Sequence, residues 1–192
     1  MPKTKLIAYF KPYLSENGSE KEELIKRSIE RRVKRRQFLL QEGDVCRHHH
    51  FVVEGCLKMY TVDSKGNEHN LQFTAENDWM TDLGSFYSEK PSQLYIEALE
   101  PSVVIQIEKS DLIFFYETFP KFDRLFRVIT ENKFVALQNR LLQNISSTAR
   151  ERYLYFLEQY PKLSNRLPNT QISSYLGITP EFLSKIRKDL VS

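Results

Sequence analysis

Near its carboxyl end the chain reads Asn169-Thr-Gln-Ile-Ser-Ser-Tyr-Leu-Gly-Ile-Thr-Pro-Glu-Phe-Leu-Ser-Lys-Ile-Arg-Lys188. This stretch predicts two short helices joined by a tight turn. Gly177 supplies the break, because glycine tolerates the left-handed backbone that a sharp turn between helices needs. Thr179 can cap a second helix, and Pro180 fits the first turn of that helix without wasting an amide hydrogen. The pattern is typical of a DNA-reading helix-turn-helix.

The side chains of these two helices divide into an apolar set and a polar set. The apolar set can close a small core between the helices: Ile172, Leu176, Ile178, Leu183 and Ile186. We expect the polar set to contact DNA, with Ser184 and Lys185 at base edges, Thr179 and Glu181 at the helix start, and Arg187 and Lys188 at phosphates. The alternative is an ordinary helix pair that only packs on its own domain.

The composition suits a folded protein of one or two domains. The chain has 192 residues, of which 41% are hydrophobic, and its 13 Phe and 10 Tyr can form real cores. The net charge is only +3, so attraction to DNA has to come from local clustering. From Arg150 onward, seven basic side chains stand against four acidic ones, so this part alone carries an excess equal to that of the whole chain.

Several classes of protein are disfavoured by what the sequence lacks. Cys46 and Cys56 are the only cysteines, too few for a disulfide scaffold or for the four thiolates of an iron–sulfur cluster. No apolar run reaches the roughly 20 residues that a membrane helix needs. We find no phosphate-binding glycine loop and no nucleophile–base pairing. We therefore expect a cytoplasmic protein that is not an enzyme, has no membrane segment and carries no cofactor.

The run His48-His-His50 invites the idea of a metal site, with Cys46, Cys56 and His69 close by in the sequence. The spacing matches no zinc pattern, and successive histidines in a strand would point to opposite faces. We therefore expect no metal site, and we place these histidines in an exposed loop between strands.

The middle of the chain changes from helical to strand-like patterns. Residues 4–14 and 20–33 are expected to be helical, and we interpret the overlapping basic run Arg31-Arg-Val-Lys-Arg-Arg36 as a solvated face. From Gln37 onward, strand-like runs alternate with turns at residues 38–40, 51–53, 57–61, 71–73, 96–99 and 103–107. Six short strands at this spacing predict a small antiparallel β-roll.

Helical spacing returns after Lys109, where Asp111 is a candidate cap for a short helix to Thr118. The longest helix is expected from Phe122 to about Ile145. Its apolar stripe includes Phe122, Phe126, Ile129, Leu137 and Leu141. A compact roll cannot cover so much apolar surface, so the stripe predicts a homodimer, with packing inside one subunit as the alternative. Residues 146–148 mark a hinge into a further helix over 149–160.

The order helix, β-roll, long helix and helix-turn-helix resembles that of the bacterial Crp–Fnr transcription regulators. The resemblance runs from about residue 20 to the end, through Gln41-Glu-Gly-Asp44, Phe51-Val-Val-Glu-Gly55, Asp63-Ser-Lys-Gly66 and Asn77-Asp-Trp-Met80. It implies an α+β fold with a jelly-roll-like antiparallel β-roll of the cyclic nucleotide-binding type. The implied domains are a sensor over 1–110, connecting and dimerisation helices over 111–145, and a DNA-binding domain over 146–192.

The resemblance also implies a function and partners. These are transcription regulation by a cytoplasmic homodimer that binds double-stranded DNA and works with RNA polymerase. The alternative is a β-roll that serves as a ligand- or partner-binding module without DNA binding.

The cyclic AMP cassette of the family is altered in this chain. In members that respond to cyclic AMP, the cassette resembles a Gly-Glu pair followed further along by Arg-Ser or Arg-Thr. Here Thr81-Asp82 and Ser92-Gln93 stand at those positions. Asp82 could still take a ribose hydroxyl, but no arginine fork reaches a phosphate. We therefore expect a vestigial pocket that does not bind cyclic AMP at micromolar levels.

Two further departures from the family concern the predicted DNA-reading helix and the residues that follow it. Family members usually carry a β-hairpin wing after the reader helix, whereas only Asp189-Leu-Val-Ser192 follow Lys188, so we expect the wing to be absent or vestigial. Pro180 stands where the family often has arginine, and Lys185 replaces a second arginine. Lysine can still bind guanine, although without the two-pronged geometry of arginine.

Overall fold

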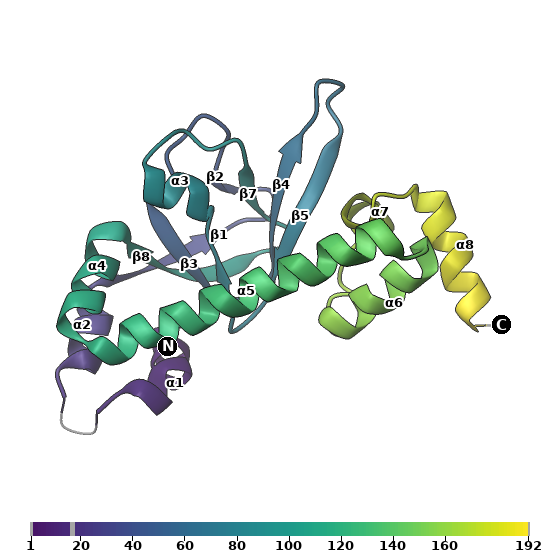
Figure 1. The fold of residues 1–192 in the computed structure, drawn as a ribbon. Coiled ribbons are helices and arrows are strands. Elements are labelled where there is room, and N and C mark those ends of the chain that lie inside the picture. The colour runs from purple at the N-terminus through teal and green to yellow at the C-terminus, as the bar shows by residue number, and fades with distance from the viewer. Residues whose placement is uncertain (1, 16–17, 192) are drawn as a thin grey trace. The chain divides into compact units, whose positions relative to one another are not determined.

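A computed structural model describes residues 2–15 and 18–191, and Figure 1 shows its fold. These residues form two compact units. Unit 1 comprises Met1–Thr61 and Leu71–Arg127, and unit 2 comprises Val62–Asn70 and Val128–Ser192. No helix within the described ranges is long and apolar enough to cross a membrane.

Unit 1 is built on two antiparallel sheets that form the expected β-roll. The strands are β1 (Ser28–Val33), β2 (Phe38–Leu40), β3 (His48–Glu54), β4 (Leu57–Val62), β5 (Glu68–Thr74), β6 (Trp79–Met80), β7 (Tyr95–Ala98) and β8 (Ser102–Glu108). One sheet has the order β1-β8-β3-β6 and the other the order β2-β7-β4-β5. The prediction of a mixed fold with an antiparallel roll is confirmed.

Several helices pack beside the roll in unit 1, and α5 continues into unit 2. In unit 1 they are α1 (Pro2–Phe10), the short 3-10 helix η1 (Lys11–Tyr13), α2 (Glu20–Lys26), α3 (Leu83–Ser88), α4 (Lys109–Thr118) and the first part of α5 (Pro120–Ser146). Aromatic rings join these helices in one core, where Phe10 of α1 stacks on Phe122 of α5 at a centroid distance of 5.0 Å. The Trp79 ring also meets Phe126 of α5.

The helix expected over residues 20–33 is wrong in its second half. The helix α2 ends at Lys26, and residues 28–33 form β1, which pairs with β8 from Ser28↔Ile107 to Val33↔Ser102. Pairing with a distant strand overrides the helical charge pattern, because the β1 backbone gains a full ladder of partners. The basic run therefore lies along an edge strand and the turn after it. The two-residue strand β6 was also not predicted.

The exposed loop expected at residues 48–50 is wrong as well. These residues begin β3 and pair with β8, and the side chains of His49 and His50 are only 6% and 1% exposed. Adjacent histidines do take opposite sides of the strand. His50 Nδ1 lies 3.2 Å from the Gln106 amide, whereas His49 lies against the rings of Phe86 and Trp79.

The cap expected for α4 differs in detail. Glu108 occupies the N-cap position without a side-chain bond to the helix. Asp111 instead accepts a 2.7 Å hydrogen bond from Arg27, so its carboxylate ties α4 to the end of α2.

In unit 2 the second part of α5 is followed by α6 (Ala149–Gln159), α7 (Asn169–Leu176) and α8 (Pro180–Val191). Figure 1 shows α6, α7 and α8 gathered in one cluster. Thr148 and Glu151 form a reciprocal capping box at the start of α6, which explains why a new helix begins directly after the hinge. Phe156, Ile172 and Leu183 are fully buried and form the centre of this cluster.

Candidate nucleic-acid interface

The turn between α7 and α8 has the expected geometry. Gly177 adopts a left-handed conformation with φ +66°, and its amide donates to carbonyls of the last turn of α7. The amide of Ile178 bonds back to the Ser173 carbonyl at 3.1 Å, which completes a Schellman-type stop. The Thr179 hydroxyl accepts the amide of Phe182 at 3.2 Å and caps α8.

The apolar set predicted for this motif does close a core. Ile172, Leu176, Leu183 and Ile186 are buried, and Ile178 is half-buried. One polar bond spans the two helices on their exposed side, where the amide of Asn169 donates to the Ser184 hydroxyl at 3.1 Å. The helices α7 and α8 are therefore held as one rigid pair.

The structure leaves most of the predicted reader residues on the outward side of α8. Glu181, Ser184, Lys185 and Lys188 are all exposed. Among the described residues Lys185 makes no hydrogen bond or ion pair, so its ammonium is available to a ligand. The Ser184 hydroxyl donates to the Pro180 carbonyl at 2.9 Å and can still accept from outside. Thr179 is exposed too, although its oxygen serves the cap.

Arg187 is arranged differently from the other predicted contacts. Its Nε donates to the Tyr153 hydroxyl at 2.9 Å, and its Nη2 donates to the Ser164 carbonyl at 3.1 Å. The side chain is half-buried and braces α8 against α6 and the following turn. A phosphate contact by Arg187 would require both of these bonds to be given up.

One residue of α8 received no role from the sequence. Phe182 is 47% exposed, although the neighbouring Leu183 is fully buried. Helical spacing alone does not reveal this, because Phe182 lies four residues before Ile186 and therefore at the edge of the apolar stripe.

Within unit 2, residues 62–70 hold α7 through a cluster that we call the hairpin clasp: Asn70, Arg140, Gln171 and Ser174. The Asn70 amide group donates to the Gln171 carbonyl and side-chain oxygen, both at 3.0 Å, and its backbone amide donates to the Ser174 hydroxyl at 3.1 Å. Arg140 of α5 donates to the Asn70 carbonyl at 2.9 Å. Its guanidinium also lies 3.8 Å above the Tyr175 ring. Asn70 is only 1% exposed, whereas Arg140, Gln171 and Ser174 are half-buried.

The vestigial cassette positions lie in unit 1, where two of them bind each other. The Ser92 hydroxyl donates to one Asp82 carboxylate oxygen at 2.6 Å, and the other oxygen accepts the Ser85 amide as the cap of α3. Asp82 and Ser92 are buried, Thr81 is half-buried and Gln93 is exposed. The carboxylate that could have taken a ribose hydroxyl is thus already engaged on both oxygens.

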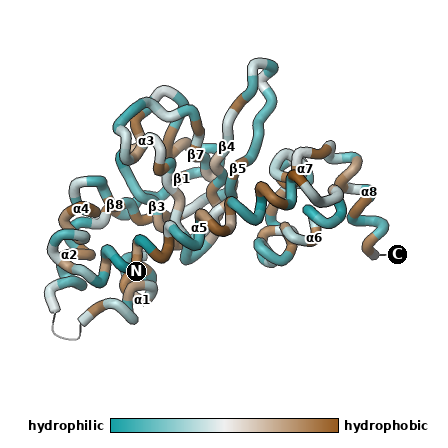
Figure 2. The backbone as a smooth tube through the Cα atoms, in the orientation of Figure 1, coloured by the Kyte–Doolittle hydropathy of each residue, from teal (hydrophilic) through white to brown (hydrophobic). Residues whose placement is uncertain are grey.

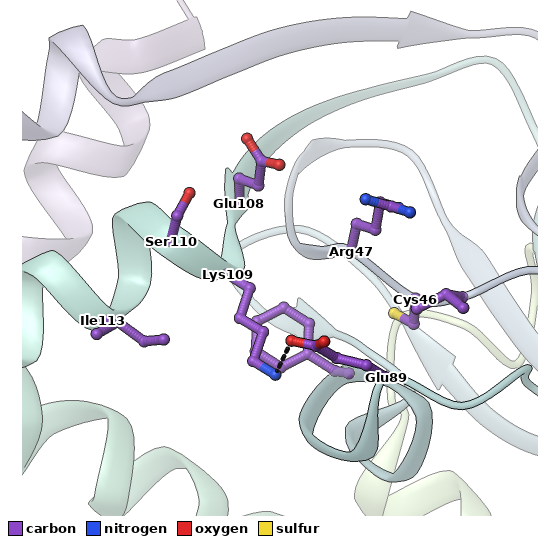
Figure 3. A pocket seen from close by; sticks show the side chains of 9 residues that line it. Cys46, Arg47, Glu89, Glu108, Lys109, Ser110 and Ile113 are labelled. Atoms are coloured by element: carbon purple, nitrogen blue, oxygen red, sulfur yellow. Dashed lines mark hydrogen bonds and ion pairs between the residues drawn. The ribbon is translucent and has the colours of Figure 1, made fainter.

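A separate cavity of about 380 Å³ opens in unit 1 at the start of α4 (Figure 3). Arg47, Phe86 and Ile113 are among its lining side chains, and none of the four cassette residues is. In Figure 3 the Lys109 ammonium reaches the Glu89 carboxylate, at 2.7 Å. The cavity combines apolar walls with charged side chains of both signs. Cys46 also lines it, and burial raises the pKa of its thiol, so this sulfur is not an activated nucleophile.

The second part of α5 carries a row of exposed apolar side chains. They are Phe134, Val135, Leu137, Leu141, Leu142 and Ile145, and each is at least half exposed. Figure 2 shows apolar and polar residues alternating along this helix. The steps from Phe134 to Leu137, Leu141 and Ile145 are three, four and four residues, which is the spacing of a coiled-coil seam.

Two residues assigned to the dimer stripe from the sequence are corrected by their burial. Phe122 and Phe126 are 0% and 3% exposed, because their rings fill the aromatic core of unit 1. Ile129 is half-buried, whereas Leu137 and Leu141 are exposed. The part of α5 that is open to another molecule therefore begins further along the helix than predicted.

Comparison with known protein families gives a match over the β-roll. The family model of the cyclic nucleotide-binding domain matches residues 30–119. No curated protein matches the chain.

Solved structures of transcription regulators share the fold. FixK2 from Bradyrhizobium japonicum is 21% identical, with 85% of this chain and 84% of that chain covered and a TM-score of 0.73. The c-di-GMP responsive global regulator CLP of Xanthomonas campestris is 15% identical, with 88% and 89% covered and a TM-score of 0.70. A putative regulator of the Crp/Fnr family from Eubacterium rectale is 16% identical, with 96% and 88% covered and a TM-score of 0.72. At these identities the likeness shows the fold.

Proposed function

We propose that this chain is a DNA-binding transcription regulator of the Crp–Fnr type, which acts as a cytoplasmic homodimer and does not respond to cyclic AMP. The observation that carries the proposal is the outward side of α8, where Ser184 and Lys185 stand exposed directly after the capped turn at Gly177. The first residues of such a helix are the ones that reach base edges in the major groove.

The exposed apolar row on α5 supports the homodimer. Six large apolar side chains between Phe134 and Ile145 lie open to solvent, and four of them follow coiled-coil spacing. A second copy of the same helix would remove them from water and would present two α8 helices to two half-sites.

The occupied Asp82 carboxylate supports the lack of a cyclic AMP response. Both of its oxygens already accept hydrogen bonds, from Ser92 and from the Ser85 amide. The carboxylate is also buried, so a ligand hydroxyl has little access to it, and no arginine stands at the cassette positions to bind the cyclic phosphate.

The test is selection of duplex DNA from a random library, followed by titration of the selected site at several salt concentrations. Lys185→Ala should relax the sequence preference, because a base contact carries about 1–3 kcal/mol of discrimination. Lys188→Ala should weaken all duplexes alike and reduce the salt slope by about one. Lys162→Ala removes an exposed lysine that lies outside α8 and serves as the matched control.

Two results would contradict the proposal. If Lys185→Ala and Lys188→Ala cause the same loss on every sequence, the two roles assigned to them are wrong. If the wild-type protein retains no duplex even at low salt, the β-roll acts instead as a ligand- or partner-binding module.

A further inference from the structure

Phe182 lies at the edge of the inner side of α8, four residues before Ile186, yet much of its side chain is exposed. Successive residues of an α-helix lie about 100° apart around its axis, so Leu183 and Ile186 define the inner side. Both are buried, whereas Phe182 is 47% exposed. Of the other aromatic residues of unit 2, Tyr153, Phe156 and Tyr175 are buried, whereas Phe134 on α5 is exposed.

The surroundings of Phe182 match a nucleic-acid surface. Lys185 follows three residues later and therefore lies on the same side of the helix, and both side chains are exposed. The Phe182 amide donates to the Thr179 hydroxyl, which fixes this residue in the first turn of α8. A ring in the first turn, next to a cation without an internal partner, is placed where a reader helix meets base edges.

The chemistry of the ring narrows what it can recognise. A phenyl group offers no conventional hydrogen-bond donor or acceptor, so it cannot read the amino, carbonyl or ring-nitrogen groups of bases. Among the four standard bases, only thymine presents a methyl group in the major groove, and apolar side chains contact it there. We propose that Phe182 is a specificity-determining residue that selects thymine through its C5-methyl group at one position of each half-site. This inference rests on the proposed DNA-binding function.

The test replaces single thymines by deoxyuridine, which differs only by the missing methyl group. Each thymine of the duplex selected by the wild-type protein is replaced in turn, and the dissociation constant is measured by fluorescence anisotropy. At one position per half-site the replacement should weaken wild-type binding about fourfold, the value of one buried methyl group. At that position Phe182→Ala should bind thymine and deoxyuridine equally, while its response to all other replacements stays as in the wild type.

Matched variants separate a methyl contact from a general effect. Leu154→Ala removes another exposed apolar side chain of unit 2, on α6, and should leave the deoxyuridine response unchanged. Phe182→Gln repeats the measurement with a second good helix former, and circular dichroism checks that both Phe182 variants keep their helices.

The outcomes distinguish this inference from the proposed function. If the Phe182 variants bind DNA and respond to deoxyuridine at every position as the wild type does, the inference is overturned while the regulator remains. If the wild-type protein selects no duplex at all, the proposed function and this inference are both wrong.

Discussion

Arg187 and Tyr153 are joined by a hydrogen bond of 2.9 Å from the guanidinium Nε to the phenol oxygen. The same guanidinium binds the Ser164 carbonyl, so one side chain of α8 anchors this helix to α6 and to the turn after it. The orientation of α8, the proposed reader helix, therefore depends on Arg187, a residue that need not touch DNA.

Arg187→Met should therefore lower the stability of the folded protein. Two hydrogen bonds from a charged donor are lost, and the expected change in the free energy of unfolding is about 2–3 kcal/mol. Urea denaturation, followed by the circular dichroism of the helices, measures the effect. Lys185→Met, at an exposed position of the same helix, should change stability by less than about 0.5 kcal/mol. Equal stability of the two variants would show that the anchor carries no energy.

Acid should destabilise unit 1 through its buried histidines. Burial lowers the pKa of His49 from 6.5 to about 4 and that of His50 to about 3, so both are neutral in the folded state at pH 5. In the unfolded chain each takes up a proton below pH 6.5, which favours unfolding. The contribution of these two neutral histidines to the free energy of unfolding is thus fully present above pH 6.5. It is lost as the pH falls toward 4, by up to about 1.4 kcal/mol per histidine and pH unit.

The variant His49→Phe tests this pH dependence. The native His49 ring lies against the rings of Trp79, Phe86 and Phe126, and neither of its nitrogens has a hydrogen-bond partner among the described residues. A phenyl ring in that place cannot be protonated, so urea midpoints should fall less steeply from about pH 7 to about pH 5 than in the wild type. An unchanged slope would mean that His49 is not the titrating group.

Cyclic AMP should not bind at low-micromolar concentration. Isothermal titration calorimetry with the full chain is expected to give no saturable heat, because Asp82 is engaged by Ser92 and no arginine stands at position 92 or 93. A low-micromolar dissociation constant would contradict the prediction.

Replacing two residues of the exposed row on α5 should weaken self-association. The double variant Leu137→Gln, Leu141→Gln removes four leucines from a symmetric interface, and we expect a dimer dissociation constant at least about 100-fold higher. Sedimentation equilibrium measures it. Ala136→Gln lies on the opposite side of the helix, at an exposed position, and is the matched control. A double variant that stays as dimeric as Ala136→Gln would place the interface elsewhere.

Loss of the hairpin clasp should loosen residues 68–70 and α7 together. Asn70→Ala removes the donor to both oxygens of Gln171. Hydrogen exchange followed by mass spectrometry should then show faster exchange in peptides covering 68–70 and 171–176, by about tenfold for a loss near 1.4 kcal/mol. Lys65→Ala, in the exposed turn of the same hairpin, should leave the α7 peptide unchanged.

The features that could be predicted from the sequence are those decided by neighbouring residues. Gly177 and Thr179 specify the turn and the cap of α8 through their own backbone and hydroxyl groups, and both do so in the structure. The apolar row from Leu137 to Leu141 is likewise a matter of local spacing.

The features that were missed depend on partners far along the chain. The strand β1 exists because β8 offers it a ladder, and a local charge pattern cannot report this. Arg187 is hydrogen-bonded to Tyr153, which is 34 residues away in the sequence, and Asn70 to Gln171, which is 101 residues away. Phe122 looked like a seam residue because the sequence did not show that α1 would bring Phe10 against it.

Unit 2, which carries α7 and α8, is discontinuous in the sequence, because residues 62–70 are covalently part of the β4–β5 hairpin yet complete the surroundings of α7. A fragment cut at Val128 would encode the helices and omit the segment that satisfies Arg140, Gln171 and Ser174. Excision of the carboxyl-terminal helices would thus leave several polar groups without their native partners. A minimal version of unit 2 would need the nine-residue segment Val62–Asn70 supplied by a graft or by the intact chain.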